Sequence, residues 1–193
     1  MKKSNFSLVK LLFAAAFVIG IFALTGCKTE PDPIPEPSGP VALAENDGLI
    51  GTWTSSWGEV YTITKDSFKS EGAYEGNSLV VLKDSETAGT IFVKYSVVYD
   101  WNNPVTENPN DESYLFYPGN PDWGTVDKWY PLNEALIGKW YAINYKDLTA
   151  TSISISGAYK KADGKSAVDT LEEAVSEFTI ENGYFGSYSE CTK

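Results

Sequence analysis

The feature that most restricts the fold of this chain is a series of short segments in which apolar and polar side chains alternate. In ATSISISGA, residues 150–158, Ile153 and Ile155 alternate with serines, and residues 89–100 alternate over a longer stretch. A period of two is that of a β-strand with one buried face. The sequence therefore predicts about eight strands. The other six strand-like segments, rich in β-branched and aromatic residues, are at 51–55, 59–64, 68–74, 78–83, 113–117 and 140–145.

Only one stretch favours a helix. In SAVDTLEEAVSEFT, residues 166–179, apolar residues recur at intervals of three and four, as they do on one face of an α-helix. Thr170 and Glu173 have the spacing of a capping box, in which each side chain accepts a hydrogen bond from the other residue's backbone N–H. The stretch GYFGSYSE after it, residues 183–190, is expected to form a short closing strand.

This order of elements predicts an all-β fold. We expect an antiparallel, up-and-down β-barrel of about eight strands with one C-terminal amphipathic helix, and a β-sandwich is the alternative. Residues 45–193 are long enough for one domain with its own core and too short for two comfortable ones.

Two near-identical pentapeptides, LIGTW at residues 49–53 and LIGKW at residues 136–140, raise the question of a duplication. Each is followed about twenty residues later by Gly-Ala-Tyr, at 72–74 and 157–159. The residues between them do not align, so we favour two strands of one barrel over a duplicated hairpin.

The tripeptide Gly51-Thr52-Trp53 resembles the Gly-x-Trp signature at the start of the first lipocalin strand. Together with the order of elements, it makes the chain similar to lipocalin-like bacterial lipoproteins. The resemblance implies that Trp53 plugs the closed end of the barrel. It also implies that Trp140 begins the seventh strand and faces the same end, and that Lys160 or Lys161 replaces the arginine that packs across the tryptophan.

The N-terminus has the features of an export signal. MKKSNFSLVK carries three lysines and no acid, and a mostly apolar stretch up to Leu24 follows it. That stretch spans roughly 21 Å as a helix, less than the roughly 30 Å of a bilayer core. Leu24-Thr25-Gly26-Cys27 resembles the lipobox of bacterial lipoproteins. The resemblance implies that residues 1–26 are a cleaved signal peptide and that Cys27 carries the covalent lipid. A simple secretory peptide is the alternative.

Residues 27–44 read as a spacer between the anchor and the domain. KTEPDPIPEPSGP, which follows Cys27, holds five prolines and no aromatic residue, a composition that favours extended chain over a packed core. Lys28 is not the aspartate that retains some bacterial lipoproteins at the inner membrane. We therefore expect an exported, membrane-anchored protein at the outer membrane or cell surface rather than the inner membrane. Once Cys27 is lipidated, Cys191 is the one remaining thiol.

The charged residues exclude several functions. The chain has no histidine, all 15 of its basic residues are lysines, and it has 26 acidic residues. Catalytic triads, His-ligated zinc and arginine clamps are thereby excluded, and nucleic acid is a poor partner for so acidic a surface. We expect no cofactor or metal. A hydrolase would have to use paired carboxylates, a lysine or a tyrosine. The carboxylate pairs available for this are Asp111 with Glu112, Asp122 with Asp127, and Glu172 with Glu173.

Two sets of aromatic residues are candidates for binding. We expect Trp53, Tyr95, Trp140 and Tyr141 on the inward faces of the barrel, where they fill the space or line a cavity. The second set lies in residues 101–131, a stretch expected to be a long loop apart from one short strand, and includes Trp101, Trp123 and Trp129.

These observations favour a binding protein that catalyses nothing. The predicted function is a membrane-anchored module that binds a protein or carbohydrate through the aromatic loop. The alternatives are a lipocalin-type carrier of a small hydrophobic molecule and, as a third, a carboxylate-based hydrolase of envelope polysaccharide.

Overall fold

The structure, a computed structural model, describes residues 39–193. The predicted signal peptide, the lipid-attachment residue Cys27 and most of the predicted spacer lie outside the described residues. Of the spacer, residues 39–44 are described. Val41 exchanges two backbone hydrogen bonds with Val81, of 2.9 and 2.8 Å, and Leu43 is buried. The chain is therefore attached to the folded body from Val41 onward.

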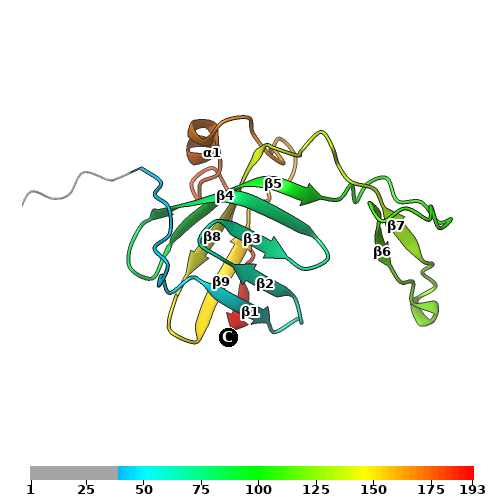
Figure 1. Ribbon diagram of the computed structural model, residues 1–193, viewed down its shortest axis with the longest axis horizontal. Helices are drawn as coiled ribbons and strands as arrows, with labels where there is room; N and C mark the ends of the chain where they lie inside the picture. The colour runs from blue at the N-terminus through cyan, green and yellow to red at the C-terminus, as the bar shows by residue number, and fades with distance from the viewer. Residues whose placement is uncertain (1–38) are drawn as a thin grey trace, which may run out of the picture. The chain divides into compact units, whose positions relative to one another are not determined.

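Eight antiparallel strands form a closed barrel (Figure 1). Their order is β1-β10-β9-β8-β5-β4-β3-β2, so each strand pairs with its neighbours along the chain and the last pairs with the first. This confirms the predicted all-β, up-and-down barrel and excludes the β-sandwich. The strands are β1 (Gly51–Ser55), β2 (Val60–Ile63), β3 (Ser67–Ser70), β4 (Tyr74–Lys83), β5 (Gly89–Val98), β8 (Trp140–Lys146), β9 (Ser152–Gly157) and β10 (Ser189–Thr192).

One predicted barrel strand lies elsewhere. The segment expected at 113–117 forms β6 (Leu115–Tyr117), which pairs with β7 (Lys128–Tyr130) in a separate two-stranded sheet. The predicted strand at 68–74 is interrupted by a turn, so that β3 ends at Ser70 and β4 begins at Tyr74. The barrel still has eight strands because β10 closes it, pairing with both β9 and β1.

The barrel interior is filled by side chains from every strand. All of them belong to one cluster of buried residues, which continues under the helix. In the register of β5 and β8, Ile91 lies opposite Ile143 and Val93 opposite Tyr141, and these residues face inward. One buried member from each barrel strand, in chain order, is Trp53, Ile63, Phe68, Val81, Ile91, Ile143, Ile153 and Cys191.

Strand β9 keeps the predicted alternation, with Ile153 and Ile155 inward, but the face that carries its serines is also largely buried from solvent. Ser154 and Ser156 are 9% and 3% exposed. Asn144, the register partner of Ser156, accepts a hydrogen bond of 2.7 Å from the Tyr188 hydroxyl. The segment between the helix and β10 therefore crosses the outer face of the barrel here and covers it.

The predicted helix is confirmed as α1 (Leu171–Glu177), which packs on the outer face of β5 and β8. Both hydrogen bonds of the capping box between Thr170 and Glu173 are present. Ala174 is fully buried. Val168, expected within the helical pattern, lies before the helix and exchanges two backbone hydrogen bonds with Trp140.

One end of the barrel is closed by Trp53, as the Gly-x-Trp resemblance implied. The side chain is fully buried, and its Nε1 donates a hydrogen bond of 2.9 Å to the carbonyl oxygen of Leu49. The lysine over this ring is Lys193, whose Nζ lies 4.4 Å from the ring centroid. The expectation of Lys160 or Lys161 was wrong, because β10 brings the end of the chain to β1.

Candidate functional site

Trp140 does not face the barrel interior, contrary to the prediction. Its register partner is Lys94, on the face opposite to that of Val93 and Tyr141, and the Lys94 Nζ lies 5.3 Å from its ring centroid. Trp140 is also at the other end of the barrel from Trp53. Because β6 is not a barrel strand, β8 is the sixth barrel strand rather than the seventh, and it runs antiparallel to β1.

Tyr95 and Tyr141, predicted as inward residues, do meet in the interior. Their rings stack with centroids 4.9 Å apart. Tyr74 packs edge-on against both, at 5.6 and 5.3 Å, and its other neighbour is Phe68 at 5.8 Å. Burial raises the pKa of Tyr95 and of Tyr141 above the usual range of tyrosine. These hydroxyls are therefore protonated at neutral pH.

These three tyrosines line a cleft of about 310 Å³ at the barrel end where β5 ends and β8 begins, and we call it the mouth cleft. Gly157 makes room beside it, since a Cβ there would lie 2.6 Å from the Tyr141 hydroxyl oxygen. The mouth cleft combines ring faces with hydroxyl and ammonium groups. Its other lining residues that carry aromatic rings or charge are Trp101, Tyr159, Lys160 and Lys165.

Sequence reasoning did not select Tyr74, Tyr159 and the two lysines as site residues. A signal for the tyrosines was present, since they are the last residues of the two Gly-Ala-Tyr tripeptides at 72–74 and 157–159. β4 begins at Tyr74 and β9 ends just before Tyr159, so both lie at the same end of the barrel. Tyr159 is 75% exposed and Tyr74 is half-buried.

Residues 101–131, expected to be mainly loop, form a hairpin that we call the arm (Figure 1). Its base is fixed to the barrel by the backbone bridge between Tyr99 and Leu132 and by a 2.8 Å hydrogen bond from the Asp100 N–H to the Pro131 carbonyl. Beyond it, β6 and β7 pair and a 3-10 turn (Pro121–Trp123) connects them. The arm is thus more ordered than predicted.

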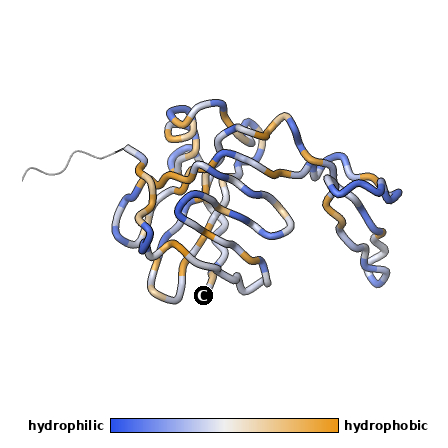
Figure 2. Tube along the Cα trace, in the orientation of Figure 1, coloured by the Kyte–Doolittle hydropathy of each residue, from blue (hydrophilic) through white to orange (hydrophobic). Residues whose placement is uncertain are grey.

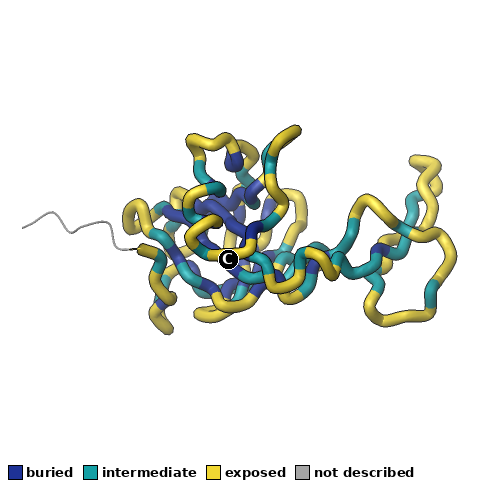
Figure 3. Tube along the Cα trace, turned by 90° about the horizontal axis from the view of Figure 1, so that it is seen from above, coloured by how far each residue is buried: buried dark blue, intermediate teal, exposed yellow. Residues whose placement is uncertain are grey.

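The arm carries aromatic rings on both sides of its small sheet. On one side Trp101 lies 4.5 Å from Tyr130 and 6.4 Å from Tyr117 between centroids. On the other side Phe116 lies 5.0 Å from Trp129. The barrel and the arm both contain hydrophobic residues (Figure 2), but those of the arm are mostly exposed or half-buried (Figure 3).

Exposure of large hydrophobic side chains is concentrated on the arm. Trp123, at the tip, is 81% exposed and Tyr117 is 57% exposed. On the barrel, Trp57 is a comparably exposed tryptophan, at 85%. Of the eleven such side chains exposed within residues 39–193, six belong to the arm: Trp101, Val105, Phe116, Tyr117, Trp123 and Val126.

Polar side chains hold the arm's tip in shape. The Asn120 side chain accepts a hydrogen bond of 2.9 Å from the Asp122 N–H, and Asp127 accepts one of 2.9 Å from the Gly119 N–H. Beside this turn lies a shallow pocket of about 390 Å³, the arm pocket, lined by polar groups, by one aromatic ring and by apolar side chains. Its lining includes Thr106, Thr125, Val126, Asp127 and Trp129.

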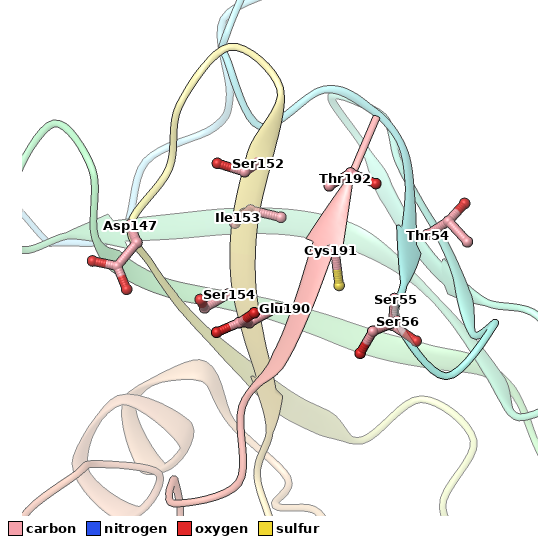
Figure 4. Close-up of a pocket in the computed structure, with 10 residues that line it drawn as sticks. All are labelled: Thr54, Ser55, Ser56, Asp147, Ser152, Ile153, Ser154, Glu190, Cys191 and Thr192. Atoms are coloured by element: carbon pink, nitrogen blue, oxygen red, sulfur yellow. The ribbon is translucent and has the colours of Figure 1, made fainter.

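A third hollow, of about 500 Å³, follows the seam where β10 meets β1 (Figure 4). It is lined mainly by hydroxyl groups and by the carboxylates of Asp147 and Glu190, and it contains none of the predicted site residues. Cys191 borders it but is buried, and burial together with the nearby Glu59 raises the pKa of its thiol to about 11. That thiol is therefore protonated at neutral pH and a poor nucleophile.

Several of the carboxylates considered for hydrolysis hold the local backbone. Glu173 accepts hydrogen bonds from the N–H groups of Asp169 and Thr170, at 3.1 and 3.3 Å. Asp111 accepts a hydrogen bond from the Ser113 N–H at 2.9 Å, and this interaction lowers the pKa of its carboxyl group. Asp127 bonds to the Gly119 N–H, as described above.

No protein-family model matches this chain, and neither does any curated protein or solved structure. Among residues 39–193, no helix is long and apolar enough to cross a membrane. The same part of the chain contains no group of three or more His, Cys, Asp or Glu side chains placed to hold a metal ion.

Proposed function

We propose that this protein is a membrane-anchored, non-catalytic binding module that holds a polysaccharide through its arm. The observation that carries the proposal is the concentration of exposed aromatic side chains on the arm, above all Trp123. Exposed rings of this kind are uncommon on a surface that has no partner. Trp and Tyr are also the residues that contribute most at binding surfaces.

The polar groups beside a further ring of the arm, Trp129, favour a sugar over an apolar partner. The arm pocket places the Trp129 ring beside the hydroxyl groups of Thr106 and Thr125 and the carboxylate of Asp127. A sugar presents an apolar ring face and a rim of hydroxyl groups. Rings can therefore stack on the face while the polar groups exchange hydrogen bonds with the rim.

The proposal is tested by binding of the full chain to insoluble peptidoglycan and to an array of neutral and acidic glycans. We expect Trp123→Ala to weaken binding about tenfold, the equivalent of about 1.4 kcal/mol. The matched control is Trp57→Ala, which removes an equally exposed indole from the barrel. Equal losses in the two variants, or binding to proteins alone, would refute the proposal of a sugar partner through the arm.

The anchor is proposed from the lipobox resemblance and has its own test. Cys27 would carry two or more acyl chains, which suffice for stable attachment to a membrane. We expect Cys27→Ser to move the protein from the membrane fraction to the soluble fraction and to abolish incorporation of labelled palmitate. Cys191→Ser is the control. If palmitate labelling persists in the Cys27 variant, the anchor is elsewhere.

A further inference from the structure

We infer that the mouth cleft binds a small molecule that carries a ring and a carboxylate group. This site lies at one end of the barrel, and Trp101 at the base of the arm is the one arm residue that lines it. It shares no lining residue with the arm pocket, so the inference does not depend on the proposed function. It rests on three properties of the mouth cleft: its ring faces, its buried hydroxyl groups and its charge.

The rings determine the shape of the ligand. Tyr95 and Tyr141 stack at 4.9 Å, and Tyr74 meets Tyr141 edge-on at 5.3 Å. Trp101, 44% exposed, lines the mouth cleft from the base of the arm. A volume of about 310 Å³ is at the lower end of small-molecule sites, which are about 300–1,000 Å³. Aromatic walls around a space of this size favour a single-ring ligand.

The tyrosine hydroxyl groups of the mouth cleft favour a ligand that carries a hydrogen-bond acceptor. Tyr95 and Tyr141 are 6% and 9% exposed. Burial keeps their pKa values raised, as it does for Tyr74, where the nearby tyrosines add to the effect. Neutral phenols donate hydrogen bonds, and those to a charged acceptor are about twice as strong as those between neutral groups.

Lysines line the mouth cleft of a chain that is acidic overall. Lys160 and Lys165 line it and no acidic side chain does, although the chain has a formal net charge of −11. Lys160 pairs with Asp163 at 3.4 Å and Lys165 with Glu177 at 3.3 Å. These are surface pairs, which contribute little stability, so the ammonium groups remain able to bind an anion.

The inference is tested with two small carboxylates, one with an aromatic ring and one with a sugar ring. The full chain in detergent micelles is titrated by calorimetry with phenylacetate and with glucuronate, and with their neutral counterparts benzyl alcohol and glucose. We expect at least one of the two carboxylates to bind saturably and one-to-one, with a Kd of about 1 mM or tighter. We expect the neutral compounds not to bind. The carboxylate that binds identifies the ligand class as an aromatic acid or an acidic sugar.

Matched variants place the binding in the mouth cleft. Lys160→Gln with Lys165→Gln should weaken it about tenfold, whereas Lys65→Gln with Lys139→Gln should leave it unchanged. The second pair removes the same charge from two other ion-paired surface lysines. Tyr95→Phe with Tyr141→Phe, which keeps both rings, should also weaken binding.

Three results would overturn the inference: no saturable binding of either carboxylate, equal binding of the neutral compounds, or equal losses in the two lysine variants. Trp123→Ala should not change this binding. A failure here is therefore distinguishable from a failure of the proposed sugar binding by the arm.

Discussion

The barrel and the arm use similar aromatic residues with opposite results. In the barrel, Trp53 and Phe68 are fully buried because eight strands close around them. In the arm, Phe116 and Tyr117 are exposed because a sheet of two strands has no second layer to cover its faces. The comparison teaches that aromatic content alone does not distinguish a core from a binding surface. What distinguishes them is whether a second layer of the fold covers the face of the strand that carries the rings.

The largest effect expected from this comparison concerns the two tryptophans. Trp53→Ala should lower the free energy of unfolding by about 3–5 kcal/mol, because it opens a cavity and leaves the Leu49 carbonyl without its donor. Trp123→Ala should change it by less than about 0.5 kcal/mol. Urea unfolding followed by circular dichroism measures both. Similar losses would show that the arm contributes to the stability of the barrel.

Substitutions at two closely packed glycines, one in the barrel and one in the arm, distinguish the stability of the whole protein from that of the arm alone. At Gly89 a Cβ would lie 2.5 Å from the Leu82 carbonyl oxygen in the barrel, and at Gly119 it would lie 2.4 Å from the Val126 carbonyl carbon in the arm. Gly89→Ala should lower the free energy of unfolding by about 1–3 kcal/mol. Gly119→Ala should leave the unfolding midpoint unchanged and alter only the near-ultraviolet circular dichroism of the arm's rings. A lower midpoint for Gly119→Ala would mean that the two regions unfold together.

Removing one buried hydroxyl group from the barrel is expected to change the free energy of unfolding by less, and to raise it rather than lower it. The Tyr145 hydroxyl has no hydrogen-bond partner within residues 39–193. Tyr145→Phe should therefore raise the free energy of unfolding by about 1 kcal/mol. Tyr117→Phe, on the exposed arm, should leave it unchanged. Destabilisation by Tyr145→Phe would show that this hydroxyl forms an interaction in the native protein.

The same hydroxyl predicts an alkaline pH dependence. Burial raises the pKa of Tyr145 from 10.0 to about 12, and Asp47 and Asp84 add to the effect. Below pH 10 the group is protonated in both states. Between about 10 and 12 the unfolded chain releases the proton while the native protein keeps it, so stability falls as pH rises. Unfolding titrations across this range should show a shallower fall for Tyr145→Phe than for the native chain, and parallel curves would contradict the assignment.

The smallest effect is expected when most of the arm is removed. Because Asp100 and Pro131 are already hydrogen-bonded, a short Gly-Ser turn can replace residues 103–129. The free energy of unfolding should change by less than about 1 kcal/mol, since loop closure depends only weakly on length. Thermal unfolding measures this, and polysaccharide binding by the shortened chain should be lost. Failure to fold would show that the barrel needs the arm.

The sequence alone determined the features that depend on neighbouring residues. The alternation in residues 150–158, the capping box of Thr170 and Glu173, and the Gly-x-Trp tripeptide that places Trp53 inside all act over a few residues. Strand type, helix start and approximate barrel size follow from such patterns. Tyr95 and Tyr141 were also identified correctly as inward residues.

Only the tertiary structure decided which strands close the barrel and which face of each strand lies inside. A period of two gives two faces without saying which is buried, so Trp140 was placed inward although helix α1 and the segment before it cover that face. Whether residues 113–117 pair in the barrel or in the arm depends on partners distant in the chain. The mouth cleft likewise gathers Tyr74, Tyr95, Tyr141 and Lys165 from separate segments. Their proximity comes from chain closure, which no local pattern specifies.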